Sequence, residues 1–346
     1  MPLPRITLPR LPGWLVTAFK VIVSLGLLTL LLQQVDIERM IGVLTPQLVP
    51  ALIAASLVLV IQSLAIGYRW HALLEALGHE ASRKWAMRQA FIGTFFNQCL
   101  PSSIGGDGYR ILMAKRLGLA WQDAVSTVLV ERYSGIVCLL IIASLGMIPL
   151  ALALTETTVI WLFIIVIGGG IAGALLIAAL AELASFRRLP GIIGRLLNAW
   201  IVGSVLAVMR RVIRSRRLLV ILGTSGIASN SANAVAVWFL GKAIGVDVGI
   251  GPYLAIMSLA VLITVIPISL AGWGLRDGVI VLLLGAVGVA ETEALIISIA
   301  FGLALLLSSL PGGIMLWRSV GYKTGNVEDI AAAETDTTES DQAGTL

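Results

Sequence analysis

The chain has 346 residues, of which 58% are hydrophobic and 12% charged, and its mean hydropathy is +0.98. A soluble domain has about 25% charged residues. The composition therefore excludes a water-soluble globular enzyme, a disordered protein and, despite a net charge of +5, a nucleic-acid-binding protein. Because the two cysteines (Cys99, Cys138) lie in apolar runs and the two histidines (His71, His79) are isolated, we expect no disulfide framework, metal site or cofactor.

Six apolar stretches are long enough to cross a membrane, since a bilayer core of about 30 Å needs about 20 apolar residues in a helix. The stretches are 14–32, 48–67, 124–153, 158–181, 218–240 and 292–317. The first continues into polar residues without a small-residue cleavage site, which predicts a retained signal anchor. The sequence thus predicts an all-α polytopic membrane protein.

Orientation in the membrane follows from the distribution of Lys and Arg between the loops. Basic residues are concentrated in 69–88, 113–123 and above all 186–217, which holds eight arginines and no acidic residue. On the other side, 33–47 and 241–252 carry one basic residue each. We therefore expect both termini to be cytoplasmic, with the protein in a bacterial cytoplasmic membrane.

The basic segment 186–217 also carries apolar residues at helical spacing, which is typical of an amphipathic helix at a membrane surface. It is either a positively charged connector that rests at the interface or a surface that recruits anionic lipid. From residue 325 onward the chain has six acidic and no basic residues. We expect a cytoplasmic segment 1–13, a membrane domain 14–320 and a disordered acidic tail 321–346.

Two apolar stretches, 88–117 and 253–288, are interrupted by related sequences, PSSIGGDG and PISLAGWG. Eight of ten positions are identical or similar when the second is placed on the first, so the chain contains an internal repeat. The matched residues include Pro101 and Pro267, Ser103 and Ser269, Gly106 and Gly272, Gly108 and Gly274, and Arg110 and Arg276.

These residue types predict a helix that breaks and restarts. Proline ends the incoming helix, and glycine lets the backbone turn. The N-terminus of the second half-helix offers unpaired N–H groups to an anion, and an arginine in its first turn adds a planar donor fork suited to phosphate.

The half-helices 88–100, 253–266 and 275–288 are each about 20 Å long, which is about two thirds of a bilayer core. Their length favours re-entrant hairpins. Because three spans separate the hairpins, they would enter from opposite sides as an inverted repeat, the arrangement in which transporters hold substrate near the membrane midplane. The alternative counts each arm as a full span and gives eight to ten helices.

Charged groups inside a membrane usually face a cavity or a partner. Neighbouring residues on a helix point about 100° apart, so Glu131 cannot simply neutralise Arg132, and we expect it to pair with Arg110. The candidate binding residues for an anionic head group are Asp107, Arg110, Glu131, Arg132, Arg276 and Asp277, together with Ser103, Ser269, Gly106 and Gly272. Further polar lining is expected from Asn97, Gln98, Ser229, Asn230, Ser231 and Asn233. The alternative is that the ion pairs only fasten the hairpins to the bundle.

The segments FFNQCLPSSIGGDGYRILMAKRLG, VLVERYSGI and PISLAGWGLRDG resemble the lysylphosphatidylglycerol synthase transmembrane-region family, also called flippase-like domain proteins. Its motif falls on Pro101, Gly105, Gly106, Asp107, Arg110, Glu131 and Arg132. The resemblance implies lipid translocation or support of lipid modification. Complete synthases carry a soluble aminoacyl-transferring domain after the membrane region, so we do not expect lysine transfer by this polypeptide alone.

Three functions are compatible with these patterns. The preferred one is a flippase, not an enzyme, for an anionic phospholipid or a polyprenyl-phosphate-linked lipid, with a second copy of the chain or a lipid-modifying enzyme as possible partners. A polyprenyl-phosphate-dependent glycosyltransferase would use Asp36 and Glu38 in the first external loop. A membrane subunit would recruit a lipid-modifying enzyme through 186–217.

Overall fold

The computed structural model describes residues 46–99, 105–154, 157–183, 200–265 and 272–343. Within these ranges the chain forms helices and short turns, with no strand. The prediction of an all-helical membrane protein is confirmed.

Five of the described helices are long and apolar enough to cross a membrane. They match five of the six predicted stretches, and the sixth, 14–32, lies outside the described residues. The apolar part of the last helix ends at Arg318. The five are α3 (Leu48–Ala76), α6 (Trp121–Ala153), α7 (Thr157–Leu183), α10 (Arg216–Ala243) and α13 (Glu291–Ala343).

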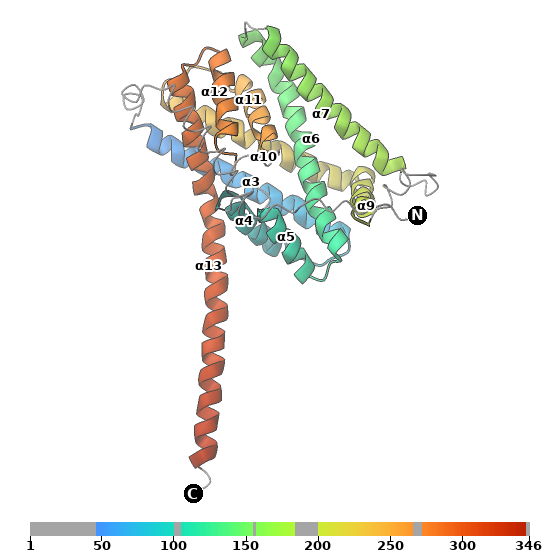
Figure 1. Cartoon of the computed structure of the whole chain (residues 1–346), viewed down its shortest axis with the longest axis vertical. Helices are drawn as coiled ribbons and strands as arrows, with labels where there is room; N and C mark the ends of the chain where they lie inside the picture. The colour runs from blue at the N-terminus through green and yellow to red at the C-terminus, as the bar shows by residue number, and fades with distance from the viewer. Residues whose placement is uncertain (1–45, 100–104, 155–156, 184–199, 266–271, 344–346) are drawn as a thin grey trace, which may run out of the picture.

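Two pairs of shorter helices occupy the places of the predicted hairpins. The first pair is α4 (Arg83–Cys99) and α5 (Gly105–Arg116), and the second is α11 (Ile250–Ile263) and α12 (Leu275–Ala286). In Figure 1 the pairs approach the middle of the bundle from opposite ends, since α5 joins α6 at the lower end and α12 joins α13 at the upper end.

The second helix of each short pair, α5 or α12, ends in the same kind of turn. Gly118 and Gly288 have φ of +101° and +88°, which glycine adopts without strain. The next N–H group in each case bonds back five residues, from Leu119 to Ala114 at 3.3 Å and from Val289 to Leu284 at 3.0 Å. This is the Schellman arrangement that ends helices. The same turn follows α3 at Gly78 and α10 at Gly245, so several of the described helices end in this way.

Helices α4 and α5 approach so closely that one motif glycine has no room for a side chain. A Cβ on Gly106 would lie 1.9 Å from the carbonyl oxygen of Gly93. The Gly106 N–H donates to Oδ1 of Asn97 at 2.8 Å. The sequence predicts that this N–H is open to an anion, whereas in the structure it bonds Asn97 and so fastens α5 to α4.

Helix α9 (Trp200–Arg214) buries Leu206, Val208, Met209 and Val212 against protein, whereas Ile201 and Val202 near its start are exposed. Two of its arginines bond the carboxyl ends of other helices. Arg210 Nε donates to the Ala181 carbonyl of α7 at 3.0 Å, and Arg211 Nη1 donates to the Ala76 carbonyl of α3 at 2.7 Å. Cations stabilise helix C-termini in this position. Recruitment of anionic lipid by 186–217 stays a prediction, and 184–199 lie outside the described residues.

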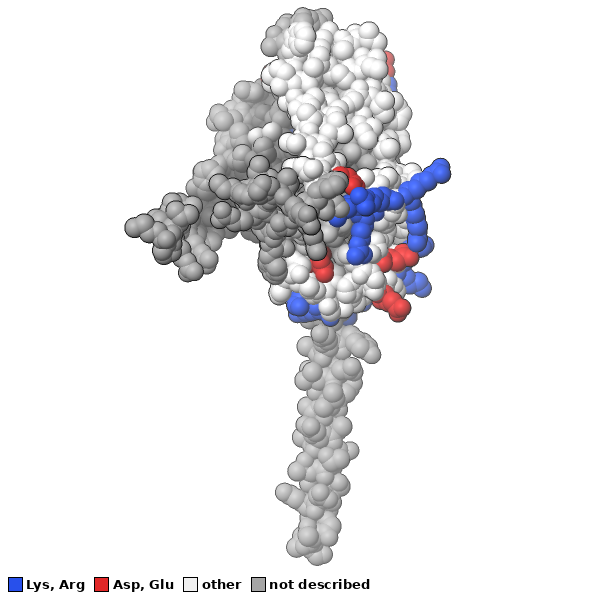
Figure 2. Space-filling view, turned by 90° about the vertical axis from the view of Figure 1, so that its right-hand side faces the viewer, with Lys and Arg blue, Asp and Glu red and all other residues white. Residues whose placement is uncertain are grey.

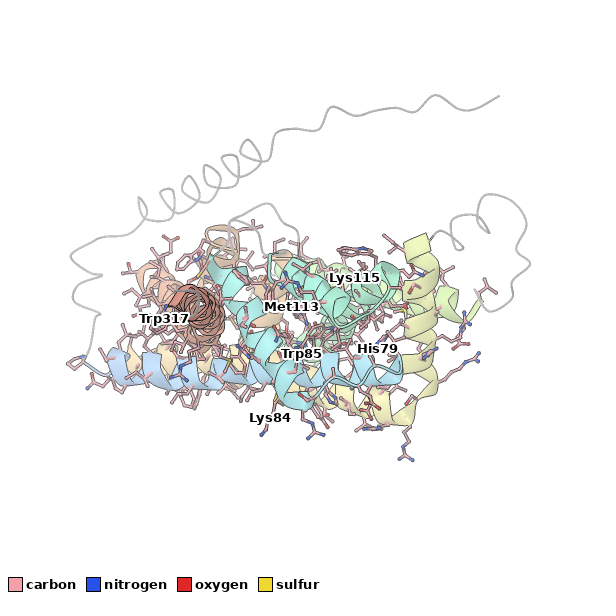
Figure 3. The ribbon with its side chains drawn as sticks, turned by 90° about the horizontal axis from the view of Figure 1, so that it is seen from below. His79, Lys84, Trp85, Met113, Lys115 and Trp317 are labelled. Carbon is pink, nitrogen blue, oxygen red and sulfur yellow. The ribbon has the colours of Figure 1, made fainter. Side chains whose placement is uncertain are left out.

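Charged side chains gather at one end of the bundle. On the face shown in Figure 2 they lie in the lower part, whereas the upper part is almost free of charge. Figure 3 looks onto the lower end and shows Lys84, Trp85, Lys115 and Trp317 there. Lys and Arg with tryptophan are typical of a cytoplasmic membrane interface, which agrees with the predicted orientation.

Helix α13 continues to Ala343, through the segment for which the composition predicts disorder. Ala and Glu, which are frequent there, have high helix propensity. Disorder of 321–346 in solution stays a prediction.

The close approach of α4 and α5 can be tested with two alanine substitutions. Gly106→Ala is expected to lower the free energy of unfolding by about 1–3 kcal/mol, because the helices must separate to admit the methyl group. Gly108→Ala is the control, since a Cβ there meets no atom within 4 Å. Thermal unfolding in detergent, followed by tryptophan fluorescence, measures both. Equal stability of the two variants would contradict the close approach.

Candidate functional site

A cavity of about 280 Å³ lies between the two short helix pairs and is lined by residues of all four of their helices and of α3, α6, α10 and α13. The structure brings five of the six predicted charged residues to this one cavity. They are Asp107, Arg110, Glu131, Arg132 and Arg276.

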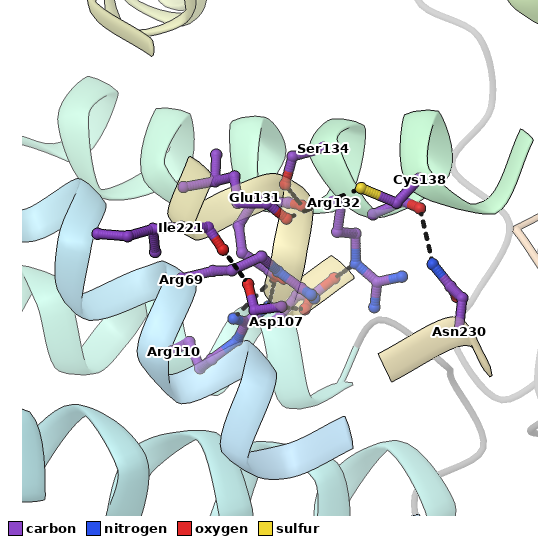
Figure 4. Close-up of polar contacts among 12 residues, drawn as sticks. Arg69, Asp107, Arg110, Glu131, Arg132, Ser134, Cys138, Ile221 and Asn230 are labelled. Atoms are coloured by element: carbon purple, nitrogen blue, oxygen red, sulfur yellow. Dashed lines mark hydrogen bonds and ion pairs between the residues drawn. The ribbon is translucent and has the colours of Figure 1, made fainter. Parts of the chain in front are cut away.

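Arg110 is the centre of the first charged cluster. Its Nη2 lies 2.8 Å from Oδ1 of Asp107, and its Nη1 lies 3.1 Å from Oε2 of Glu131. The predicted pairing of Glu131 with Arg110 is confirmed. Arg132 donates from Nε to the second carboxylate oxygen of Asp107. Figure 4 shows these groups converging from α5 and α6.

A third arginine, Arg69 of α3, completes the cluster. Its Nε and Nη2 donate to Oε1 of Glu131 at 2.8 and 2.5 Å. The residue is 4% exposed, and its Nη1 has no hydrogen-bond partner among the described residues. Sequence analysis placed Arg69 in a basic loop because the apolar stretch ends at residue 67. The helix continues to Ala76, and the only signal was the apolar spacing of Trp70, Leu73 and Leu74 beyond the arginine.

The spacing of the charged residues along α5 and α6 explains which side chains pair within the cluster. Asp107 and Arg110 are three residues apart on α5 and therefore share one face. Glu131 and Arg132 are adjacent on α6 and point in different directions, so one meets Arg69 and Arg110 while the other reaches Asp107. Three guanidinium groups share two carboxylates, which leaves one net positive charge.

The second charged cluster is built on Arg276 of α12. Its Nη2 lies 2.8 Å from Oδ1 of Asp277, and its guanidinium carbon lies 5.4 Å from the Trp273 ring centre and 5.2 Å from that of Phe301. Two aromatic rings and one carboxylate thus hold the guanidinium in a single orientation at the cavity wall.

Asp277 lies behind this arginine and does not line the cavity. Its side chain is fully buried and accepts from Ser298 at 2.6 Å and from the Gly274 N–H at 2.9 Å. Asp277 therefore caps α12 and positions Arg276. Gly272 and Gly274 have φ of +87° and +83°, so both glycines serve the turn into this helix.

The two halves differ where the repeat would make them alike. Glu131 follows Gly118 by 13 residues, and Phe301 follows Gly288 by the same number. Arg110 therefore meets a carboxylate at the position where Arg276 meets an aromatic ring. The acidic charge of the cavity is concentrated in the first half.

The cavity also has an amide wall, formed by neutral side chains of α3, α4 and α10. It consists of Gln62, Asn97, Gln98, Asn230 and Asn233. Four of these were expected as polar lining, and Gln62 was not.

Several predicted residues do not reach the cavity or cannot be placed. Gly106 and Gly272 are not among its lining residues. Ser103, Ser269, Asp36 and Glu38 lie outside the described residues.

The fold and the cavity define a polytopic helical membrane protein with a charged site inside its helix bundle. The sequence matches the family described as Lysylphosphatidylglycerol synthase TM region over residues 17–312, and the chain belongs to this family. The matched region contains both short helix pairs and the whole cavity. Comparison with curated proteins gave no match.

The buried cluster should respond to the loss of one carboxylate far more than an exposed ion pair does. Glu131→Gln leaves Arg69 and Arg110 under-compensated and is expected to cost about 3–5 kcal/mol of stability. Glu75→Gln is the control because Glu75 pairs with Arg217 at 3.2 Å on the exposed surface, where ion pairs contribute little. The apparent melting temperatures in detergent measure the difference. A similar small shift in both variants would show that the Glu131 pairs are not structurally important.

Proposed function

We propose that this protein is a flippase-like transporter that moves an anionic, phosphate-bearing lipid across the membrane. The observation that carries the proposal is the composition of the charged cluster, in which the described ion pairs join three arginines (Arg69, Arg110 and Arg132) to two carboxylates (Asp107 and Glu131). Arg69 is buried and its Nη1 has no hydrogen-bond partner among the described residues, and Arg132 is partly exposed at the cavity. A phosphodiester brings one negative charge and oxygen acceptors that would pair with these guanidinium groups.

Arginine suits this task because its planar fork of donors matches phosphate oxygens. Arg276 supplies a fork from the other helix pair and lines the same cavity. A phosphate in the cavity can thus be held from both halves of the molecule.

The arrangement of the short helices supports movement as well as binding. The two pairs approach the cavity from opposite ends of the bundle (Figure 1). In our proposal they are re-entrant hairpins of an inverted repeat, and rocking of one against the other exposes the cavity to each side in turn.

The family name refers to lysylphosphatidylglycerol synthase. For this chain we propose handling of the lipid rather than transfer of lysine. The carboxylates of the cavity are paired with arginines, and the arginines are suited to bind a phosphate.

A translocation assay in proteoliposomes tests the proposal. Fluorescent phosphatidylglycerol is reconstituted, and dithionite quenching reports its movement between leaflets. Arg132→Gln is expected to slow translocation at least about tenfold, as loss of one charge-assisted contact to the phosphate would. The double variant Arg276→Gln with Asp277→Asn is expected to do the same, and it removes a cation and its anion together so that no unpaired charge stays buried.

Arg217→Gln is the matched control, since Arg217 lies on the exposed surface and pairs with Glu75. It should translocate lipid at the wild-type rate. Wild-type rates in both cavity variants would refute the transport proposal.

A further inference from the structure

We propose that the transported lipid carries an uncharged, hydroxyl-bearing head group, such as a glycerol, another polyol or a sugar, on its phosphodiester. This inference rests on the proposed function and names its substrate class. It is based on the amide wall of the cavity, because binding of the lipid phosphate alone would not require these amide side chains.

The amide wall holds hydrogen-bonding groups that the protein leaves unused. Asn233 is 5% exposed, and its Oδ1 accepts from Gln62, whereas its Nδ2 makes no hydrogen bond to a described residue. The Gln98 amide bonds to no other described residue at all.

In two further amides of the wall, only one of the two polar atoms makes a hydrogen bond to a described residue. Asn230 donates from Nδ2 to the Gly135 carbonyl at 3.1 Å, a bond drawn in Figure 4, and no described group donates to its Oδ1. Asn97 accepts from Gly106, and its Nδ2 has no acceptor within the described ranges. The cavity thus offers both spare donors and spare acceptors.

A hydroxyl group matches such a wall because it donates and accepts at once, as an amide does. The unused amide atoms line the cavity and are not buried in protein, so they are open to a ligand that can pair with them. Several hydroxyls on one head group would engage amides of α4 and α10 together, while the phosphate meets the arginines.

The same cavity disfavours a cationic head group. An ammonium needs a carboxylate or several free acceptors. Asp107 and Glu131 each already bind two arginines, and the cluster has a net positive charge. An amine-bearing or aminoacylated lipid would bring a like charge into this site.

Amides within a membrane bundle also serve to hold helices together. The bonds of Gln62 to Asn233 and of Asn230 to Gly135 do this. That role accounts for the bonded atoms only. It does not account for Gln98 or for the unused atoms of its neighbours, which line the cavity that holds the arginines.

A pair of lipids that differ only in hydroxyl groups tests the inference. Phosphatidylglycerol and phosphatidylpropanol have the same net charge and, with the same acyl chains, the same number of carbon atoms. Binding to the full chain in nanodiscs is measured by native mass spectrometry. We expect phosphatidylglycerol to bind about tenfold more tightly, which corresponds to one or two hydrogen bonds. Lysylphosphatidylglycerol should bind more weakly than phosphatidylglycerol.

Substitutions in the amide wall should remove the preference and leave the phosphate contact intact. Gln98→Leu breaks no hydrogen bond between described residues, so folding is unaffected, and Asn230→Leu is the second variant. Both should bind phosphatidylpropanol as the wild type does and lose most of the preference for phosphatidylglycerol. Thr224→Val, on the exposed side of α10, is the control and should keep the wild-type preference.

The outcomes separate the two proposals. Equal binding of both lipids by the wild type would refute the hydroxyl-bearing head group and leave phosphate binding standing. A preference that survives both leucine variants would also overturn the role of the amide wall. If neither lipid binds, the proposed function itself is refuted.

Discussion

The carboxylate of Glu131, buried between Arg69 and Arg110, is the interaction on which the rest of the site depends. It joins α3, α5 and α6, and through Arg110 it fixes Asp107, which in turn holds Arg132. Removing one partner of a buried ion pair leaves an unpaired buried charge, which is strongly destabilising. The same ion pairs therefore hold three helices together and place arginine and carboxylate groups at the wall of the cavity.

The charge of Arg276 on α12 is compensated in a different way from that of Arg110 on α5. Arg276 is compensated by the neighbouring Asp277 and held between two rings, and Asp277 is itself anchored by the start of α12 and by Ser298. The carboxylate partner of Arg276 thus lies on α12 itself and not on the long helix α13 that follows. The two short helix pairs therefore contribute different walls to the cavity, one rich in charge and one in aromatic surface.

The long helices could be predicted because apolar length alone decides which segments can span lipid. The interruptions between α4 and α5 and between α11 and α12 could also be predicted from the sequence, because proline and glycine act locally. Arg69 was misplaced because the end of an apolar run does not mark the end of a helix. The close approach of Gly106 to α4 could not be predicted, because the sequence does not show that the Gly93 carbonyl lies where a Cβ of residue 106 would be.

The sequence by itself determined that lipid is the solvent, where the helices run and break, and which charged residues need partners. Each of these follows from local composition and spacing. Only the tertiary structure decided the partners: which arginines share Glu131, that Asp277 caps a helix instead of lining the cavity, and that amides of α4 and α10 line it together. The reason is that a pairing between helices depends on their distance and rotation, which are set by packing between segments far apart in the chain.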